Sequence, residues 1–308
     1  MKVLLINPAQ DTRRTAGHYR RMLAVMPPIS LAYLAASLEQ AGVEVEIYDD
    51  ALAGGDRAAL EAALRASRAD LVGLSVVTSM MPDVVRVVEV IRSASPQSRV
   101  VLGNIHAHVY HAELLTAGIA DMVVLGEGEV TLVELARCLA SSRGALEDVA
   151  GIAFLRDGEV VRTPPRPLVE DLDTLPFPAW HLFPMERYRL FNFARVREPG
   201  VLIQGSRGCP YGCNYCSLKI MGPSRRARSA RSIADEFEQL HERFGFVQPS
   251  FVDPIFPFSR EEGLALAGEL IRRGLSRKQV WITEARTDLV DLELLQALSE
   301  AGLRRIMF

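Results

Sequence analysis

The segment Cys209-Pro210-Tyr211-Gly212-Cys213-Asn214-Tyr215-Cys216 holds three of the four cysteines of this 308-residue chain, in the spacing C-x3-C-x2-C. A structural zinc site uses four protein ligands, and iron–sulfur clusters are usually held by four cysteines. Three thiolates on a cubane cluster leave one iron open to a ligand that is not protein. Zinc would lack one ligand here, because no histidine or further cysteine adjoins the segment. A redox dithiol of Cys213 and Cys216 would leave Cys209 without a role. The pattern therefore favours a cluster with one open iron.

The sequence after residue 200 alternates between short apolar strands and amphipathic helices. A strand over Val201–Gln204 ends shortly before the cysteines. Further strands are expected over 249–253, 280–283 and 305–308, and helices over 232–244 with Ser232 as N-cap, 260–273 and 292–301. Asp253 follows one strand, and Glu284 and Arg286 follow the next. Side chains in such positions form the catalytic rim of a β/α barrel, so this half predicts the beginning of a barrel.

The first half shows the same alternation at a spacing typical of an open sheet. Strands are expected over 3–6, 43–48, 71–77, 99–102 and 122–125, and helices over 29–40, 57–67, 82–94 and 130–141. This order predicts an α/β fold with a doubly wound, Rossmann-like parallel sheet. Such a sheet binds ligands beyond the carboxyl ends of its strands. The segments expected there are Asn7-Pro8, Val77–Ser79, Gly103–His108 and Gly126–Glu129. Their glycines either admit a large flat ligand or are the ordinary turn glycines of a flavodoxin-like sheet.

A proline-rich stretch separates the two halves. Residues 152–155 and 160–162 are expected to form a hairpin around Asp157-Gly158. Prolines follow at positions 164, 165, 167, 176, 178 and 184, and Trp180 and Phe183 are expected to pack between domains. The predicted division is a domain over residues 1–145, a connector with a hairpin over 146–197 and a second domain over 198–308.

The composition is that of an ordinary globular protein, with 49% apolar and 24% charged residues. A net charge of −3 does not favour a nucleic-acid partner. No apolar run reaches the ~18 residues of a membrane-spanning helix. Clustered cysteines of this kind are no disulfide framework, so a reducing cytoplasm is predicted. The basic cluster Arg225-Arg226-Ala227-Arg228 is interpreted as a solvated loop or as a site for one anionic ligand.

The segment Gly205–Cys216, with Tyr215 before the last cysteine, resembles the signature of the radical S-adenosylmethionine (radical SAM) enzymes. Further segments resemble the cobalamin-binding branch of that superfamily, namely Arg228-Ser229, Asp235-Glu236, Phe251–Phe256 and Glu284–Asp288. The first half resembles the N-terminal cobalamin-binding domain of the branch at Pro27–Ala35, Gly103–His106 and Gly126–Glu129. The resemblance covers essentially the whole chain. It implies a Rossmann-like cobalamin-binding domain followed by part of a radical SAM barrel.

In the second half, the resemblance implies that Cys209, Cys213 and Cys216 each ligate one iron of a [4Fe–4S] cluster, whose fourth iron binds S-adenosylmethionine. The residues expected to contact S-adenosylmethionine are Tyr215, Asp253, Glu284 and Arg286. Asp253 would receive the methionine amine, and Arg286 would pair with the methionine carboxylate. An alternative stays open, in which Glu284 and Arg286 pair with each other.

In the first half, the resemblance implies a cobalamin site. Its expected residues are Asn7, Pro8, Val77, Thr78, Gly103, Asn104, His106, Gly126, Glu127, Gly128 and Glu129. Many cobalamin domains supply a cobalt-ligating histidine from an Asp-x-His-x-x-Gly loop, but the corresponding stretch 7–13 has no histidine. Val77 and Thr78 are therefore expected beneath the corrin, without an imidazole ligand. A metal site at His106 and His108 is the alternative to contact between His106 and the corrin.

Three classes of function follow from the resemblance. The first is a cobalamin-dependent methyltransferase at an unactivated carbon, which uses a 5′-deoxyadenosyl radical and methylcobalamin and needs an external one-electron reductant. The second is a cobalamin-dependent cyclase or ring-rearranging enzyme, and the third is a corrinoid-binding homologue without catalysis. A complete radical SAM barrel has more strand–helix units than the three units and fourth strand of residues 201–308. The sequence therefore predicts a truncated barrel and leaves the substrate open.

Overall fold

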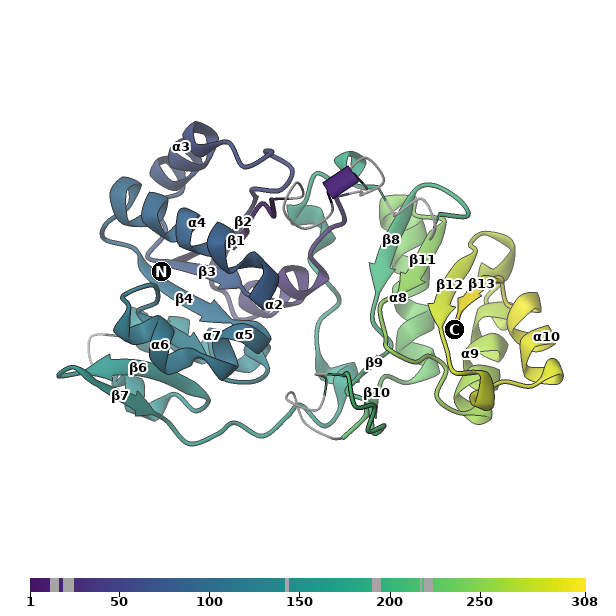
Figure 1. Ribbon diagram of the computed structural model, residues 1–308. Coiled ribbons are helices and arrows are strands. Elements are labelled where there is room, and N and C mark those ends of the chain that lie inside the picture. The colour runs from purple at the N-terminus through teal and green to yellow at the C-terminus, as the bar shows by residue number, and fades with distance from the viewer. Residues whose placement is uncertain (12–16, 19–24, 142–143, 190–194, 217, 219–223) are drawn as a thin grey trace. The chain divides into compact units, whose positions relative to one another are not determined.

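The computed structural model describes residues 1–11, 17–18, 25–141, 144–189, 195–216, 218 and 224–308 (Figure 1). The chain forms two compact units. The first comprises Met1–Arg21, Pro28–Val169 and Pro176–Arg187, and the second comprises Met22–Pro27, Glu170–Leu175 and Tyr188–Phe308. The units interleave along the chain, whereas the sequence predicts linear boundaries at 145 and 197, because parts of the connector pack with each unit.

The described residues of the first unit contain a seven-stranded sheet of order β2-β1-β3-β4-β5-β6-β7. The strands are β1 (Lys2–Asn7), β2 (Glu44–Asp49), β3 (Leu71–Ser75), β4 (Arg99–Gly103), β5 (Met122–Val124), β6 (Ile152–Arg156) and β7 (Glu159–Arg162). Strands β1 to β5 are parallel, whereas β6 and β7 pair antiparallel. The predicted hairpin therefore extends this sheet. Its turn uses positive φ angles of 51° at Asp157 and 85° at Gly158.

Helices cover both faces of this sheet (Figure 1). They are α2 (Ile29–Gln40), α3 (Arg57–Ser67), α4 (Met81–Ala94), α5 (Asn104–Val109), α6 (His111–Thr116) and α7 (Gly128–Ala140). Leu4 and Ile6 join one buried cluster with Leu60 of α3 and Val87 of α4. Because side chains alternate along a strand, the intervening residues of β1 face the opposite side, where α2 and α7 pack together.

The stretch after β4 differs from the sequence prediction. Residues 104–108 were expected as a ligand-facing loop, but α5 begins at Asn104 and α6 follows almost directly. Asn104 has a φ of 77°, and its side-chain Oδ1 accepts a hydrogen bond of 2.6 Å from the Ile105 backbone nitrogen. Asparagine tolerates this left-handed conformation, which turns the chain directly from strand into helix. Trp180 and Phe183, expected between domains, both lie in the first unit, where they are buried.

The second unit is built on a four-stranded, fully parallel sheet of order β13-β12-β11-β8 within its described residues. Its strands are β8 (Gly200–Ile203), β11 (Gln248–Phe251), β12 (Trp281–Glu284) and β13 (Leu303–Met307), and its helices are α8 (Ala230–Phe244), α9 (Arg260–Arg272) and α10 (Leu292–Glu300). The helices gather on one side of the sheet (Figure 1), as in the wall of a β/α barrel. A buried aromatic group forms the core, with the rings of Phe251 and Phe256 stacked at 4.2 Å and Trp281 edge-on to Phe251.

Two details complete this unit. The N-cap of α8 is Ser229, whose hydroxyl accepts from the Ser232 nitrogen at 3.1 Å, so the prediction of Ser232 as N-cap is wrong. A short antiparallel ribbon, β9 (Ser206–Arg207) with β10 (Arg226–Ala227), flanks the cysteine segment. Across all the residues described, no helix is both long enough and apolar enough to cross a membrane.

Candidate functional site

The start of the cysteine loop, residues 205–208, is fastened to Asp253 from the neighbouring strand. Asp253 follows β11, which pairs with β8. Its carboxylate accepts a hydrogen bond of 2.8 Å from the Gly205 nitrogen and one of 2.5 Å from the Ser206 hydroxyl. The residue is 1% exposed, and burial raises its pKa to about 6, against the opposing effect of these two donors. Asp253 therefore joins two adjacent strand ends at the base of the loop.

Arg228 holds the same stretch from the other side. Its backbone nitrogen donates to the Gly205 carbonyl at 2.8 Å, and its guanidinium donates to the Gln204 carbonyl at 3.0 Å. The guanidinium also forms a buried ion pair with Glu236 of α8. Burial raises the pKa of Glu236, whereas the charge of Arg228 opposes that rise. The interpretation of the 225–228 cluster as a solvated loop is wrong, because Arg226 is only 9% and Arg228 only 6% exposed.

Gly208, the residue before the first cysteine, lies against the chain that returns to β10. It has a φ of 81°, and a Cβ atom placed there would lie 2.2 Å from the Ser224 carbonyl oxygen. Only glycine combines this backbone conformation with so close an approach. The path from β8 to the first cysteine is therefore fixed at Gln204, Gly205, Ser206 and Gly208 in turn.

The three clustered cysteines are free, partly exposed thiols. The Cys216 nitrogen donates to the Cys213 carbonyl at 3.1 Å, which tightens the second half of the loop. Within the described ranges, no three histidine, cysteine or acidic side chains converge closely enough to hold a metal ion. The structure therefore fixes the start of the loop but does not gather the three sulfur atoms. Free thiols do not attract one another, and metal–thiolate bonds would supply that convergence. As a donor set, three accessible thiols fit an iron–sulfur cluster.

A ladder of two aromatic rings with a guanidinium group at each end lies at the cysteine loop. The Arg286 guanidinium lies 4.0 Å from the centre of the Tyr211 ring, which lies 5.8 Å from the Phe258 ring. Arg225 lies over the other ring at 4.7 Å and binds Glu262 at 2.7 Å. The hydrogen bonds to Asp288 are the main cause that raises the pKa of Arg286. The ladder therefore places the Arg286 guanidinium beside the cysteine loop.

Two expected contacts differ in the structure. Arg286 binds Asp288 through two hydrogen bonds of 2.9 and 2.8 Å, so the alternative pairing with Glu284 is wrong. The Glu284 side chain is exposed, and its backbone carbonyl accepts from the Phe256 nitrogen at 2.8 Å. Tyr215 is 93% exposed. The structure thus brings Arg286 to the cysteine loop and leaves Glu284 and Tyr215 facing solvent.

The carboxyl edge of the first sheet collects the other set of predicted residues. The strand order 2-1-3-4-5 reverses direction between β1 and β3, and doubly wound sheets bind ligands at such a switch point. Asn7 and Pro8 leave β1 there, and Val77 and Thr78 leave β3. The Asn7 side chain donates to Asp49 at 2.9 Å. The next backbone nitrogen, that of Ala9, donates to the buried Asp50 at 3.0 Å. These contacts shape the loop after β1.

Thr78 and His106 meet across this edge. The Thr78 hydroxyl lies 3.0 Å from His106 Nδ1, and the His106 backbone nitrogen donates to the Val76 carbonyl at 3.2 Å. Asn104 donates to the Ser75 hydroxyl at 2.9 Å, which adds a second link between the ends of β3 and β4. Burial lowers the pKa of His106, so the neutral imidazole is favoured. In the described part of the chain, no third histidine, cysteine or acidic side chain completes a metal site with His106 and His108, and the metal alternative stays a prediction.

In the segment Gly126–Glu129, which follows β5, the two carboxylates point into the protein, and the backbone is left to face a ligand. Gly126 has a φ of 101°. Gly128 opens α7 against Leu34, and a Cβ atom there would lie 2.8 Å from the leucine side chain. The Glu127 carboxylate accepts from the Val169 nitrogen at 2.8 Å, and Glu129 is buried at 7% exposure. The turn around Gly126 is therefore the part of this segment that can approach a ligand.

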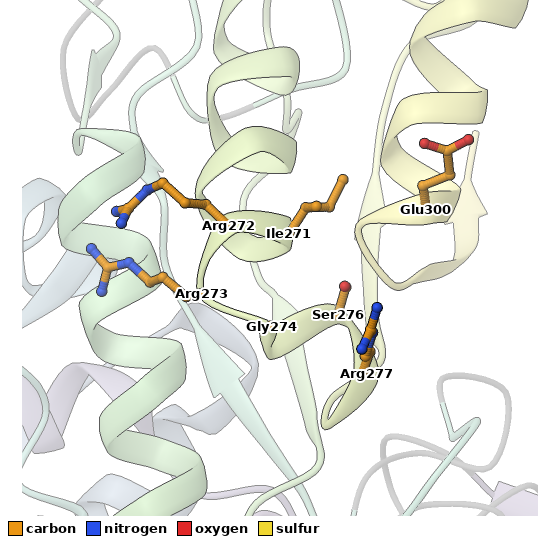
Figure 2. Close-up of a pocket in the computed structure, with 7 residues that line it drawn as sticks. All are labelled: Ile271, Arg272, Arg273, Gly274, Ser276, Arg277 and Glu300. Carbon is orange, nitrogen blue, oxygen red and sulfur yellow. The ribbon is translucent and has the colours of Figure 1, made fainter.

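A cavity of about 600 Å³ lies elsewhere in the second unit (Figure 2). Its lining residues are Ile271, Arg272, Arg273, Gly274, Ser276, Arg277 and Glu300. Arg273 is already paired with Asp235 and Glu269. The cavity adjoins the carboxyl ends of α9 and α10, which precede the amino ends of β12 and β13. In a β/α unit this is the rim opposite the catalytic one, so the cavity is not part of the candidate site.

Comparison with known proteins identifies both halves. The B12 binding domain family matches residues 21–136, and the Radical SAM superfamily matches residues 203–308. An uncharacterized methyltransferase of Pyrococcus horikoshii is 28% identical over 100% of this chain and 65% of its own length. An anaerobic magnesium-protoporphyrin IX monomethyl ester cyclase of Rubrivivax gelatinosus is 30% identical over 98% of this chain and 54% of its own length. The chain thus spans between about half and two thirds of these relatives.

Solved structures share the fold. The cobalamin-dependent S-adenosylmethionine radical enzyme OxsB, with aqua-cobalamin and S-adenosylmethionine bound, superposes with a TM-score of 0.80 at 19% identity, over 99% of this chain and 43% of OxsB. The radical S-adenosylmethionine methyltransferase TsrM of Kitasatospora setae gives a TM-score of 0.78 at 22% identity, over 99% of this chain and 58% of TsrM. With a B12-binding domain and a radical SAM domain joined in one polypeptide, the chain belongs to the cobalamin-binding radical S-adenosylmethionine family.

Proposed function

We propose that this chain is the cofactor-binding part of a cobalamin-dependent radical SAM enzyme that transfers a methyl group to an unactivated carbon. The observation that carries the proposal is the presence of two ligand-binding sheet edges in one chain. One edge is the switch point of the B12-binding sheet, and the other carries Cys209, Cys213 and Cys216 beyond a β/α strand. Relatives named methyltransferase, including the hopanoid C-3 methylase of Methylococcus capsulatus, support the methyl-transfer assignment.

The second unit would hold the cluster and S-adenosylmethionine. When bound, a [4Fe–4S] cluster supplies the electron that splits S-adenosylmethionine, and cobalamin supplies the methyl group. The chain's own part is to hold and orient these groups. Cys209, Cys213 and Cys216 would ligate three irons, and Arg286, positioned by Tyr211 and Asp288, would attract the methionine carboxylate. Glu284 and Tyr215 stay predicted contacts of S-adenosylmethionine. An external one-electron reductant and a cytoplasmic location complete the proposal.

The first unit would hold cobalamin. Asn7 and Pro8 after β1, Val77 and Thr78 after β3, and the turn around Gly126 would face the corrin. Thr78, backed by His106 at 3.0 Å, would present a hydroxyl where many cobalamin domains present an imidazole. Gly103 and Asn104 would set the spacing between the ends of β3 and β4, because Asn104 donates to Ser75. Glu127, Gly128 and Glu129 would not touch the corrin directly. They would hold the turn around Gly126 in place through their contacts inside the protein.

A second candidate function is ring closure without methyl transfer. It is favoured by the relatives named anaerobic magnesium-protoporphyrin IX monomethyl ester cyclase, one of which is 30% identical to this chain. The mass of the product separates the two, because methyl transfer adds one CH₂ to the substrate and ring closure does not.

Anaerobic reconstitution of the full-length protein tests the proposal. Iron, sulfide and corrinoid content would be measured together with the formation of 5′-deoxyadenosine from S-adenosylmethionine under reducing conditions. We expect one [4Fe–4S] cluster and one corrinoid per chain, and 5′-deoxyadenosine that depends on both reductant and cluster. Uptake of zinc in place of iron would contradict the proposal. Cluster and corrinoid uptake without cleavage would favour a corrinoid-binding protein that is not an enzyme.

A further inference from the structure

We propose that Asp253 is a positioning residue for the cysteine loop, which it holds through Ser206, and that it is not the group that receives the methionine amine. The inference rests on the proposed function, since it concerns the loop that would carry the cluster. It assigns a role to Ser206 and replaces the sequence-based role of Asp253.

The hydrogen bonds of Asp253 carry the first step. One carboxylate oxygen accepts from the Gly205 nitrogen at 2.8 Å and the other accepts from the Ser206 hydroxyl at 2.5 Å. Asp253 is 1% exposed, and so is Ser206. Both oxygens thus already bind groups of the protein. Because the carboxylate is buried, an ammonium group from a ligand could reach it only if the residues around it moved.

The position of these donors carries the second step. Gly205 and Ser206 lie between the end of β8 and Cys209, so the carboxylate acts on the part of the chain that aims the first thiol. Arg228 fixes the same part through the Gln204 and Gly205 carbonyls. Gly205 itself packs against Phe256, where a Cβ atom would come within 2.8 Å of the ring. The side chains of Asp253 and Arg228, both buried and charged, together with the Arg228 backbone nitrogen, thus bind the polar groups of residues 204–206.

The chemistry of the carboxylate explains why an acid stands here. An aspartate accepts at both oxygens, which matches two donors that enter from one side. Hydrogen bonds to a charged group are stronger than those between neutral groups, so the pair can hold the start of the loop in one position. An asparagine could still accept from the Gly205 nitrogen and donate its NH₂ to the Ser206 oxygen. Alanine could do neither.

Four variants test the inference: Ser206→Ala, Asp253→Asn, Asp253→Ala and the double variant Ser206→Ala with Asp253→Ala. Each would be reconstituted anaerobically and examined for the rate of iron loss to a chelator, for the electron paramagnetic resonance spectrum of the reduced cluster with and without S-adenosylmethionine, and for S-adenosylmethionine affinity. We expect Ser206→Ala and Asp253→Ala to lose iron about tenfold faster than the wild type and to broaden the spectrum. Asp253→Asn should retain the wild-type spectrum and its change on S-adenosylmethionine binding. The double variant Ser206→Ala with Asp253→Ala should lose iron at the same rate as Asp253→Ala alone. Both substitutions remove the same hydrogen bond between Ser206 and Asp253.

A matched control is Ser250→Ala. Ser250 is also a buried serine, 3% exposed, and its hydroxyl accepts from Gln248 at 3.2 Å within β11 and away from the loop. It should leave iron retention and the spectrum unchanged. Ser206→Ala and Asp253→Asn keep the test decisive if Asp253→Ala does not fold.

The opposite result is equally clear. If Asp253 received the methionine amine, Asp253→Asn would weaken S-adenosylmethionine binding at normal iron content, and Ser206→Ala would behave as wild type. That outcome would overturn the inference and leave the proposed function intact. Failure of the wild-type protein to take up an iron–sulfur cluster would instead contradict the proposed function itself.

Discussion

The carboxyl edges of the two sheets are built differently. In the first unit, the loops are joined by hydrogen bonds between side chains near the surface, such as Thr78 with His106 at 3.0 Å and Gln10 with Ser79 at 3.3 Å. In the second unit, the edge is braced by buried charged groups, with Asp253 and Glu236 at 1% and Arg228 at 6% exposure. Buried charges are costly unless they are paired and hydrogen-bonded. The first edge also has such a group, because the buried Asp50 pairs with Arg86 and accepts from the Ala9 nitrogen, but at the second edge three of them gather around one loop.

The difference matches what each edge would bind. A corrin is large and would be held by many weak contacts spread over several loops, none of which needs a rigid position. An iron–sulfur cluster is held by a few thiolate bonds of fixed length, so the chain that carries the thiols must start from a fixed point. We infer that the second edge is sensitive to single changes and that the first is tolerant of them.

The largest effect is expected from the thiols themselves. Cys209→Ala should reduce cluster uptake and S-adenosylmethionine cleavage to background and leave corrinoid uptake unchanged, because only the second edge loses a ligand. Iron, corrinoid and 5′-deoxyadenosine assays check this. Cys138→Ala is the control, since Cys138 is a half-buried thiol of α7, whose pKa is raised mainly by burial. Loss of iron in the Cys138 variant, or its retention in the Cys209 variant, would contradict the assignment.

The next effect concerns the buried ion pair. Arg228→Met leaves Glu236 buried without its cation, which costs about 3–5 kcal/mol of unfolding free energy for a broken buried pair. The two tryptophans lie one in each unit, so urea unfolding followed by fluorescence of Trp281 in a Trp180→Phe background reports on the second unit.

The double variant Arg228→Met with Glu236→Leu is the control for that measurement. It removes both charges, and most of the lost stability should return, because an apolar pair avoids the uncompensated carboxylate. The remaining loss would measure the bonds from Arg228 to the Gln204 carbonyl and to Ser232. If the urea midpoint of Arg228→Met equalled that of the wild type, the ion pair between Arg228 and Glu236 would contribute nothing to the stability of the second unit.

The buried polar contacts of the second edge are harder to predict from the sequence than the strands are. Apolar runs bounded by turn residues located the strands, and the predicted bounds of α2 and α3 match the structure. The hydrogen bond from Ser206 to Asp253 joins residues 47 positions apart, and no local pattern announces it. Glu236, by contrast, had a readable signal. It lies on the helix face of Ile233, Phe237 and Leu240, which faces the core. A carboxylate buried on such a face is stable only when it is paired, so the position predicts a buried cation beside it.

The first edge was predictable for another reason. Parallel strands bring their carboxyl ends to one side, so the loops after β1, β3 and β5 were placed together by topology alone. The helix α5 was missed, because six residues rich in histidine give no clear helical period and because Asn104 begins it in a left-handed conformation. The cysteines were found from spacing, but spacing alone does not give their convergence, which depends on bonds to iron.

A smaller effect is expected when Asp253 changes its charge. Its pKa is raised by burial from 3.8 to about 6, so folding favours the protonated form. The stabilising contribution is therefore complete below about pH 4 and is lost as the pH rises through about 6. Each tenfold change in proton affinity corresponds to about 1.4 kcal/mol, which gives a loss of about 3 kcal/mol over this range. Asp253→Asn should remove that pH dependence.

The same Trp281 unfolding experiment, repeated between pH 4 and 7, measures this effect as the difference between wild type and Asp253→Asn. Taking the difference removes the contributions of other titrating groups. A difference that does not change with pH would mean that Asp253 keeps its ordinary pKa. The second edge would then keep the charge of Asp253 down to about pH 4.

The smallest effect is expected at the first edge. Thr78→Val keeps the shape of the side chain and removes the hydrogen bond to His106, a loss of about 1 kcal/mol, or about fivefold in hydroxocobalamin affinity measured by equilibrium dialysis. Thr116→Val is the control, because the Thr116 hydroxyl donates to the Ala112 and Glu113 carbonyls of its own helical stretch. Iron content should stay constant in both variants. If Thr78→Val abolished corrinoid binding, the first edge would be as sensitive to a single change as we infer for the second. A modest loss would instead show that its tolerance comes from many contacts of similar weight.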